Sequence, residues 1–259
     1  MSAEQFGRGD AALVERLGRV RSGLDDAARA AGRDPSEVTL VAVSKLHPAS
    51  RIRALAQAGH RDFGESYIQE ALAKQEELAG QEFDGKDEIF WHFIGGLQSN
   101  KAKYVPGRFA LLHSLDSLKL AQTLHKRLSA SPESAERPGC GRGTGAPLGV
   151  LIQVNLGRET QKCGIEEEGL LELAEALAGM DTMRLKGLML MPPACAPDQA
   201  RVYFSRLREV RDGLERRLGA ALPELSMGMS GDFAEAVAEG ATLVRVGTDI
   251  FGPRPTRNA

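Results

Sequence analysis

One lysine of this sequence stands where an amine could do covalent chemistry. Lys45 follows the apolar run at 39–44, and the alternation along that run places it on the same face as Val41 and Val43. Apolar surroundings favour the neutral form of a lysine, and the neutral amine attacks an aldehyde to form a Schiff base. Lysines at strand ends also extend into solvent, so the position alone leaves both interpretations open.

Two loops further along the chain have the composition of a phosphate-binding site. Their sequences are SMGMSGD at 226–232 and VGTDIFG at 246–252, at the ends of the last two apolar runs. Small residues let backbone N–H groups approach an anion, hydroxyl groups add donors, and the start of a helix adds partial positive charge. Turns and helix caps use the same residues, but two such loops together favour a phosphate site.

Arg245 lies within an apolar run, between Val244 and Val246. A guanidinium group needs a partner in such a place because the loss of its hydration is costly. A carboxylate of the protein and a ligand inside the fold would both offset that cost, and the sequence does not choose between them.

Three histidines suggest a rival chemistry. His47, His92 and His113 lie at or near the ends of apolar runs, and barrel hydrolases bind metal ions with such residues. No H-x-H or H-E-x-x-H spacing occurs, however, and His92 between two aromatic residues is more typical of a core histidine. A metal-dependent hydrolase is the weaker interpretation.

The elements that must position these residues follow a regular pattern in which short apolar runs alternate with amphipathic stretches. The runs occupy 39–44, 61–64, 89–94, 110–115, 148–156, 185–191, 224–229 and 242–247. Several are apolar on both faces, as in strands buried between a core and a layer of helices. Strand–helix units repeated eight times in a chain of 259 residues predict a single α/β domain over 1–259, a (β/α)8 TIM barrel with its site at the C-terminal ends of the strands. A doubly wound open sheet is the competing architecture.

Two segments stand outside this pattern. Residues 10–31 repeat apolar side chains at helical spacing and predict an extra helix ahead of the barrel. Residues 131–149 are rich in Gly, Pro and Ser and predict a flexible surface loop. Because this loop precedes a strand, we expect it at the N-terminal face of the barrel, away from the site.

Composition excludes several classes of protein. A formal net charge of −2 offers no basic surface for nucleic acid or an anionic membrane. No apolar run reaches the length of a membrane span, and the N-terminus lacks the apolar core of a secretion signal. The cysteines, Cys140, Cys163 and Cys195, form no C-x-x-C pair, so neither disulfides nor a zinc site is indicated. We therefore expect a cytoplasmic protein.

Eight segments resemble, in order, motifs of the YggS/PROSC-type pyridoxal phosphate (PLP) homeostasis proteins, which are related to the N-terminal barrel of alanine racemase. The segments are VAVSKLHP, FGESYIQE, WHFIGGLQSNK, HSLDS, VNLGRETQKCGI, GLMLMPP, LSMGMSGDFAEAV and VRVGTDIFGPR. The resemblance covers nearly the whole chain from Val38 to Arg254. Ser66 and Gly96 depart from it, since the family usually has Asn and Pro at these positions.

The resemblance implies a PLP-binding barrel of fold type III. It implies that Lys45 carries PLP as a Schiff base and that Arg245 faces the pyridine nitrogen. The cofactor-binding residues that we expect on this basis are Lys45, His92, Ser226, Met227, Ser230, Arg245, Gly247 and Thr248. Ser226, Ser230, Gly247 and Thr248 are expected around the phosphate.

The resemblance further implies a carrier or regulator in vitamin B6 and amino-acid homeostasis, a monomer whose partners are PLP and PLP-dependent apo-enzymes. An arginine beside the pyridine nitrogen disfavours its protonation and weakens the ring as an electron sink. Racemisation also needs a second base, which alanine racemases take from a C-terminal β domain that we do not expect here. Of Tyr67, Tyr104 and Tyr203, only Tyr67 is expected near the site. We therefore expect little or no catalysis, with a PLP-dependent racemase as the alternative.

Overall fold

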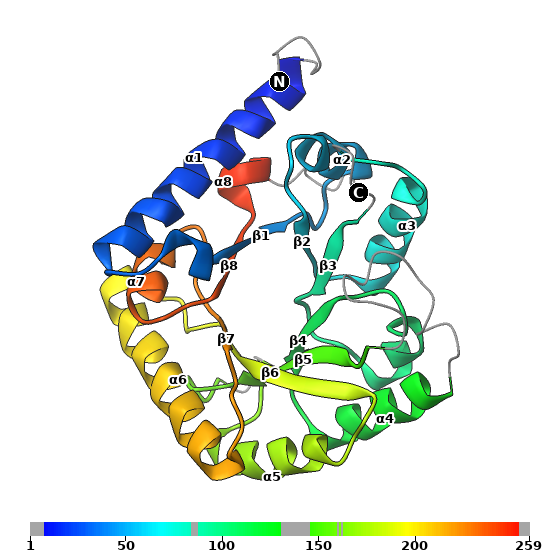
Figure 1. The fold of residues 1–259 in the computed structure, drawn as a ribbon, viewed down its shortest axis with the longest axis vertical. Coiled ribbons are helices and arrows are strands. Elements are labelled where there is room, and N and C mark those ends of the chain that lie inside the picture. The colour runs from blue at the N-terminus through cyan, green and yellow to red at the C-terminus, as the bar shows by residue number, and fades with distance from the viewer. Residues whose placement is uncertain (1–7, 84–87, 131–145, 160, 162, 254–259) are drawn as a thin grey trace.

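The computed structural model describes residues 8–83, 88–130, 146–159, 161 and 163–253, and within them the chain forms a closed barrel of parallel strands arranged in chain order. The strands are β1 (Thr39–Val43), β2 (Asp62–Glu65), β3 (Phe90–Phe93), β4 (Leu111–Leu115), β5 (Leu148–Val154), β6 (Met183–Leu190), β7 (Glu224–Ser226) and β8 (Leu243–Val246). β8 pairs with β1, with Leu243 opposite Thr39, and this pairing closes the ring (Figure 1). The predicted (β/α)8 barrel is confirmed, and the open sheet is excluded.

Helices surround the strands as an outer ring (Figure 1). They are α1 (Arg8–Ala30), α2 (Ala49–Gln57), α3 (Ile68–Leu78), α4 (Leu118–Ser129), α5 (Glu167–Ala178), α6 (Pro197–Leu218), α7 (Phe233–Ala238) and α8 (Thr248–Phe251), with the 3₁₀ helices η2 (Pro35–Glu37) and η3 (Ser99–Tyr104). The prediction of a helix after every strand is wrong for the third unit. There, η3 takes the place of an α-helix, because Pro106 and Gly107 follow it closely and leave too little chain for one.

The extra helix predicted at 10–31 is confirmed as α1. Its apolar face, formed by Leu13, Leu17, Val20 and Leu24, is buried. α1 packs against α2, α7 and α8, so it covers the place where the first and last units of the barrel meet. None of the described helices is both long and apolar enough to cross a membrane.

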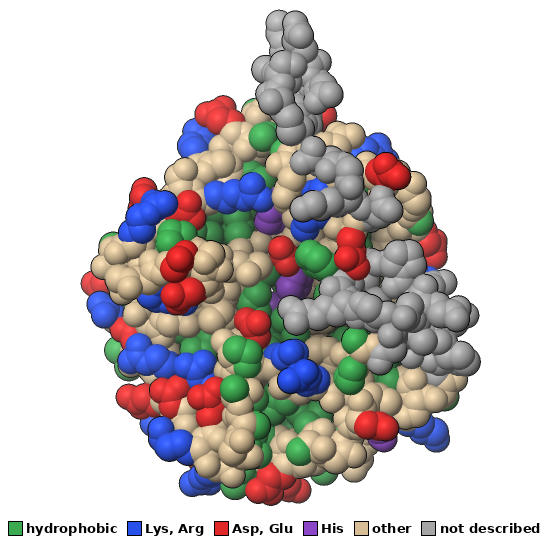
Figure 2. Space-filling model, viewed as in Figure 1, with side chains coloured by type: hydrophobic (Ala, Val, Ile, Leu, Met, Phe, Trp, Pro, Cys, Tyr) green, Lys and Arg blue, Asp and Glu red, His purple; other side chains and the backbone are tan. Residues whose placement is uncertain are grey.

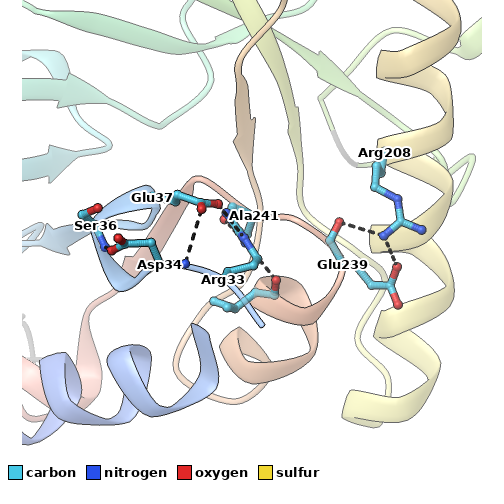
Figure 3. Close-up of polar contacts among 8 residues, drawn as sticks. Arg33, Asp34, Ser36, Glu37, Arg208, Glu239 and Ala241 are labelled. Atoms are coloured by element: carbon cyan, nitrogen blue, oxygen red, sulfur yellow. Dashed lines mark hydrogen bonds and ion pairs between the residues drawn. The ribbon is translucent and has the colours of Figure 1, made fainter. Parts of the chain in front are cut away.

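Polar contacts tie the connection between α1 and β1 to α7 and to the segment before β8 (Figure 3). Arg33 Nη1 donates to the carbonyl oxygens of Val237 at 2.9 Å and Ala241 at 2.8 Å. Close by, Arg208 of α6 forms an ion pair of 2.8 Å with Glu239, which follows α7. These contacts hold the short connections around α7 and thereby fix where β8 enters the barrel.

The interior of the barrel is divided between apolar and polar side chains. Val41, Leu111, Leu151, Met189 and Leu243 form a buried apolar cluster within the ring of strands. Polar residues that hydrogen-bond to one another across β3, β4, β7 and β8 are buried as well: His92, His113, Ser226 and Arg245. A barrel core usually consists of branched apolar residues, so this polar group calls for a physical reason.

Strand boundaries differ slightly from the sequence-based ones. β7 ends at Ser226 rather than at 229, because Gly228 adopts a φ of +89° and turns the chain. Of the predicted loop at 131–149, residues 131–145, which include Cys140, lie outside the described residues. Ala146 and Pro147 line a cavity at the N-terminal face, which is the face that we expected for this loop.

Candidate functional site

A cavity of about 550 Å³ opens at the C-terminal ends of the strands, and Lys45 lines it. Ser66 and Tyr67, which follow β2, and Gly95 and Gly96, which follow β3, line the same cavity. Lys45 therefore lies at the C-terminal mouth of the barrel, beside the ends of other strands, as predicted. Both departures from the resemblance, Ser66 and Gly96, face the same space.

The backbone on the N-terminal side of Lys45 is held by a buried ion pair. Glu65 at the end of β2 accepts a hydrogen bond from Ser44 Oγ at 2.7 Å. Lys74 of α3 donates to the same Glu65 oxygen at 2.6 Å and to the carbonyl oxygen of Ser44 at 2.8 Å. Ser44 is thus fixed through both its side chain and its backbone.

The backbone on the C-terminal side of Lys45 is held by the same network. Glu70, one helical turn before Lys74, accepts from Lys74 Nζ at 2.6 Å and from the backbone N–H of Leu46 at 2.5 Å. Leu46 has a φ of +66°, a conformation that is strained for a branched residue and persists only when its surroundings hold it. We call Ser44, Glu65, Glu70 and Lys74 the clamp, because together they fix the chain on both sides of Lys45.

Charge within the clamp is unbalanced, with one ammonium group between two carboxylates. Burial raises the pKa of Glu65, and the neighbouring Lys74 opposes this shift. The second oxygen of Glu65, Oε2, is buried without a hydrogen-bond partner among the described residues. Lys74 is therefore the group that makes a buried carboxylate tolerable at this position.

The loop after β8 comes close to the end of β1. A Cβ added to Gly247 would lie 3.4 Å from Val43 Cβ, two residues before Lys45. The ring of His47 stacks on Phe251 of α8 with 5.1 Å between centroids, so the segment after Lys45 is anchored to the last helix. The residues around Lys45 and those of the last loop therefore form one continuous surface.

The loop after β7 packs closely on α7. A Cβ added to Gly228 would lie 2.6 Å from Ala236 Cβ, so glycine is required here by contact as well as by its φ. Ser230 is half-buried in this loop, and Thr248 at the start of α8 is exposed. Neither hydroxyl lines the cavity around Lys45, and Met227 is fully buried in the apolar core.

Arg245 lies inside the barrel and is only 4% exposed. Its Nη1 donates to Ser226 Oγ at 2.6 Å and its Nη2 donates to the carbonyl oxygen of Leu190 at 3.0 Å. Among the described residues no carboxylate lies within ion-pair distance of it. Burial lowers the pKa of Arg245 to about 10, and the charge of Asp232 acts in the opposite direction. The guanidinium is therefore still charged at neutral pH.

From Ser226 a line of hydrogen bonds runs through the barrel. Ser226 Oγ lies 2.8 Å from His113 Nδ1, and His113 Nε2 lies 2.9 Å from His92 Nδ1. His92 Nε2 lies 3.1 Å from Oδ1 of Asp62, the first residue of β2. Burial lowers the pKa of His113 well below its ordinary value, so this imidazole is neutral.

The line ends in a second cavity, at the N-terminal mouth. This cavity has a volume of about 500 Å³, and Asp62 and His92 line it. Figure 2 shows the barrel from this mouth, with histidine side chains inside the central hollow. His92, which we expected among the cofactor-binding residues, therefore lies towards the opposite mouth from Lys45.

The structure does not gather the three histidines of the metal hypothesis. His92 and His113 contact each other, but His47 stacks on α8. Within the described ranges, no group of three His, Cys, Asp or Glu side chains is placed to hold a metal ion.

Sequence reasoning missed the clamp and Asp62. The four-residue spacing of Glu70 and Lys74 on a helix was a visible signal of an ion pair. Glu65 gave no such signal, because nothing in its local sequence distinguishes a buried carboxylate from one at the surface.

Three comparisons relate the chain to known proteins. The family described as alanine racemase, N-terminal domain matches residues 17–255. The chain is 44% identical over 243 residues to a pyridoxal phosphate homeostasis protein of Pseudomonas aeruginosa, covering 93% of this chain and 96% of that protein. It is 41% identical over 246 residues to the pyridoxal phosphate homeostasis protein of Escherichia coli K12, covering 93% and 97%. A solved structure of PipY from Synechococcus elongatus PCC7942 with PLP bound has a TM-score of 0.76 and 35% identity, and the match covers 93% of this chain and all of that one.

Proposed function

The chain belongs to the pyridoxal phosphate homeostasis protein family, and we propose that it binds PLP at the C-terminal mouth of the barrel with Lys45 as the covalent anchor. In this proposal the protein holds PLP for vitamin B6 and amino-acid homeostasis and is not an efficient enzyme. PLP-dependent apo-enzymes as recipients, a monomeric state and a cytoplasmic location are further parts of the proposal.

The observation that carries the proposal is the way in which Lys45 is presented. Its side chain lines a cavity at the C-terminal mouth, and the clamp holds the backbone on both of its sides. A lysine that anchors a cofactor needs a fixed backbone, because the position of the backbone determines where the side-chain amine can bind the cofactor. Lys45 is half-buried and precedes the strained Leu46, and backbone strain of this kind is typical of functional sites.

The residues present fit PLP in their chemistry. The glycines of the two loops allow close approach of an anion, and Ser230 and Thr248 offer hydroxyl groups to a phosphate. Arg245 offers a buried cation at the end of β8, next to the strand that carries Lys45. When bound, PLP supplies an aldehyde that reacts with amines and a ring that accepts electrons.

Each group of this chain then has a definable task. Lys45 supplies the amine, the loops after β7 and β8 bind and orient the phosphate, and Arg245 keeps positive charge beside the pyridine nitrogen. A positive charge there disfavours a proton on that nitrogen and so weakens the ring as an electron sink. This arrangement favours holding the cofactor over transforming an amino acid with it.

Reduction with borohydride, followed by peptide mapping, tests the anchor. We expect the PLP label on Lys45 in the wild-type protein and no label on this peptide in Lys45→Ala. Lys101 is the matched control, because it lines the same cavity. Lys101→Ala should keep the label, and a label found on Lys101 would overturn the assignment of Lys45.

One observation supports a second function, that of an amino-acid racemase. Tyr67 lines the cavity with Lys45 and is 54% exposed, so its hydroxyl group could serve as a second base. Deuterium exchange into the α-position of alanine, measured per bound PLP, tests this function. Exchange that disappears in Tyr67→Phe would favour the racemase, whereas negligible exchange in the wild type favours the carrier.

A further inference from the structure

The buried guanidinium of Arg245 raises a question of energetics. A charge that is taken out of water needs a compensating charge or several well-oriented hydrogen bonds. Arg245 has a hydroxyl and a carbonyl oxygen as partners, and no carboxylate of the described chain is within ion-pair distance. The charge of Asp232 supplies part of the compensation. The line of hydrogen bonds from Ser226 to Asp62 offers a further part, because it ends in a carboxylate.

The direction of this line follows from the number of protons that each group can give. A carboxylate only accepts, so His92 donates from Nε2 to Asp62. If His113 donates from Nε2 to His92 Nδ1, each polar atom of the two imidazoles has one partner in the line. The neutral His113 in turn accepts at Nδ1, and the group that can donate there is the hydroxyl of Ser226.

The oxygen of Ser226 completes the line. Its proton is given to His113, so its lone pairs face the guanidinium, and Arg245 donates to it at 2.6 Å. All donors from Arg245 to Asp62 therefore point the same way, and each hydrogen bond polarises the next. In this arrangement the cation at one end and the anion at the other are linked by three neutral groups.

We propose that Asp62, at the N-terminal mouth, is a positioning residue for Arg245 and acts through His92, His113 and Ser226. Asp62 fixes the tautomers of both imidazoles, and these fix the orientation in which Ser226 accepts from the guanidinium. The part of the inference that concerns the cofactor rests on the proposed function; the orientation of the line does not.

Two consequences follow for the residues of the site. The hydroxyl group of Ser226 donates its proton to His113. Ser226 therefore acts on the cofactor through Arg245 and is not a donor to the phosphate. The N-terminal mouth, which in barrels usually serves stability, here carries a residue that acts on the functional mouth.

Nitrogen-15 NMR of the full-length protein with labelled histidine reads the tautomers directly. Wild-type protein should show both His92 and His113 protonated at Nε2. In Asp62→Leu, part of the His113 population should move to the Nδ1-protonated form. Thr39→Val is the matched control, because Thr39 lines the same cavity outside the line, and it should give the wild-type pattern.

A second variant keeps the inference testable if Asp62→Leu does not fold. Ser226→Ala removes the other end of the line with a small change in volume. If Asp62 sets the direction, both imidazoles stay protonated at Nε2 in this variant. Protonation of His113 at Nδ1 in the wild type, as a doubly protonated His92 would require, or a switch of tautomer in Ser226→Ala, would overturn the inference.

Equilibrium dialysis against PLP tests the link to the cofactor. The dissociation constant should rise about two- to tenfold in Asp62→Leu, as expected for a weakened hydrogen bond, and should not change in Thr39→Val. An unchanged constant in Asp62→Leu would overturn the action on Arg245. Wild-type protein that shows the expected tautomers but binds no PLP would instead overturn the proposed function and leave the orientation of the line intact.

Discussion

Two buried polar networks hold the functional mouth of this barrel, and they are built differently. The clamp is compact and lies between the sheet and α3, with Lys74 2.6 Å from each of two carboxylates. The line from Asp62 to Arg245 is extended and lies inside the ring of strands, where neutral groups separate its charged ends. The clamp fixes a stretch of backbone, and the line fixes one side chain.

The two networks stabilise their buried charges in different ways. In the clamp, opposite charges touch, so the removal of one partner exposes the full desolvation cost of the others. In the line, the opposite charges do not touch, so the removal of one neutral member costs a hydrogen bond and does not leave a buried ion without its counter-charge. We therefore expect graded effects of substitution, with the largest in the clamp.

Lys74→Met should have the largest effect, a loss of about 3–5 kcal/mol in the free energy of unfolding, because it leaves two carboxylates without their ammonium partner. The pKa of Glu65, which burial already raises above its ordinary value of 4.5, should rise further. A carboxyl group with a raised folded pKa favours folding less as the pH rises, so the variant should regain stability as the pH falls towards 4.5. Denaturant unfolding at several pH values measures both effects.

The control for Lys74→Met is Lys126→Met, which removes an exposed lysine from α4. It should change the stability by less than about 0.5 kcal/mol. A loss in Lys74→Met no larger than that of the control, or one that does not vary with pH, would contradict the role of the clamp.

Ser226→Ala should cost less, about 1.5–3 kcal/mol, because it removes one hydrogen bond to a charged group and leaves the contact with Leu190 intact. Thermal unfolding without PLP measures this loss. A loss as large as that of Lys74→Met would erase the distinction between the two networks.

Ser230→Ala and Thr248→Val lie outside both networks and test the phosphate site alone. Each should weaken PLP binding by about 1 kcal/mol, roughly a fivefold rise in the dissociation constant, with little change in the stability of the PLP-free protein. Unchanged PLP binding in the double variant would move the phosphate to another part of the mouth.

Ser44→Ala should have the smallest effect, about 0.5–1 kcal/mol in the free energy of unfolding. It removes the hydroxyl contact with Glu65, whereas Lys74 still holds the Ser44 carbonyl oxygen. Comparison with Lys74→Met thus separates the charged part of the clamp from its neutral part. Equal losses in the two variants would show that the hydroxyl, and not the ion pair, holds the strand end.

The barrel could be predicted from the sequence because its strands are short apolar runs at regular intervals, and even the weak run at 61–64 appears as β2. Lys45 could be placed because the end of an apolar run marks the mouth of a barrel. The line from Asp62 to Arg245 could not be predicted, because its members are separated by 19, 113, 21 and 30 positions and are brought together only by the register of five strands. Local sequence patterns do not show which side chains of distant strands will contact one another.

The position of α1 has a consequence for the order in which the protein is completed. α1 precedes the other described helices and strands in the chain, yet two of its partners, α7 and α8, are made after nearly all of them. Until then part of the apolar face of α1 has no helix to pack against. The closure of the ring of strands by β8 and the packing of α1 on α7 and α8 therefore both come late. Contacts of such large sequence separation slow folding, and the part of the apolar face that packs on α7 and α8 stays uncovered until these helices are made.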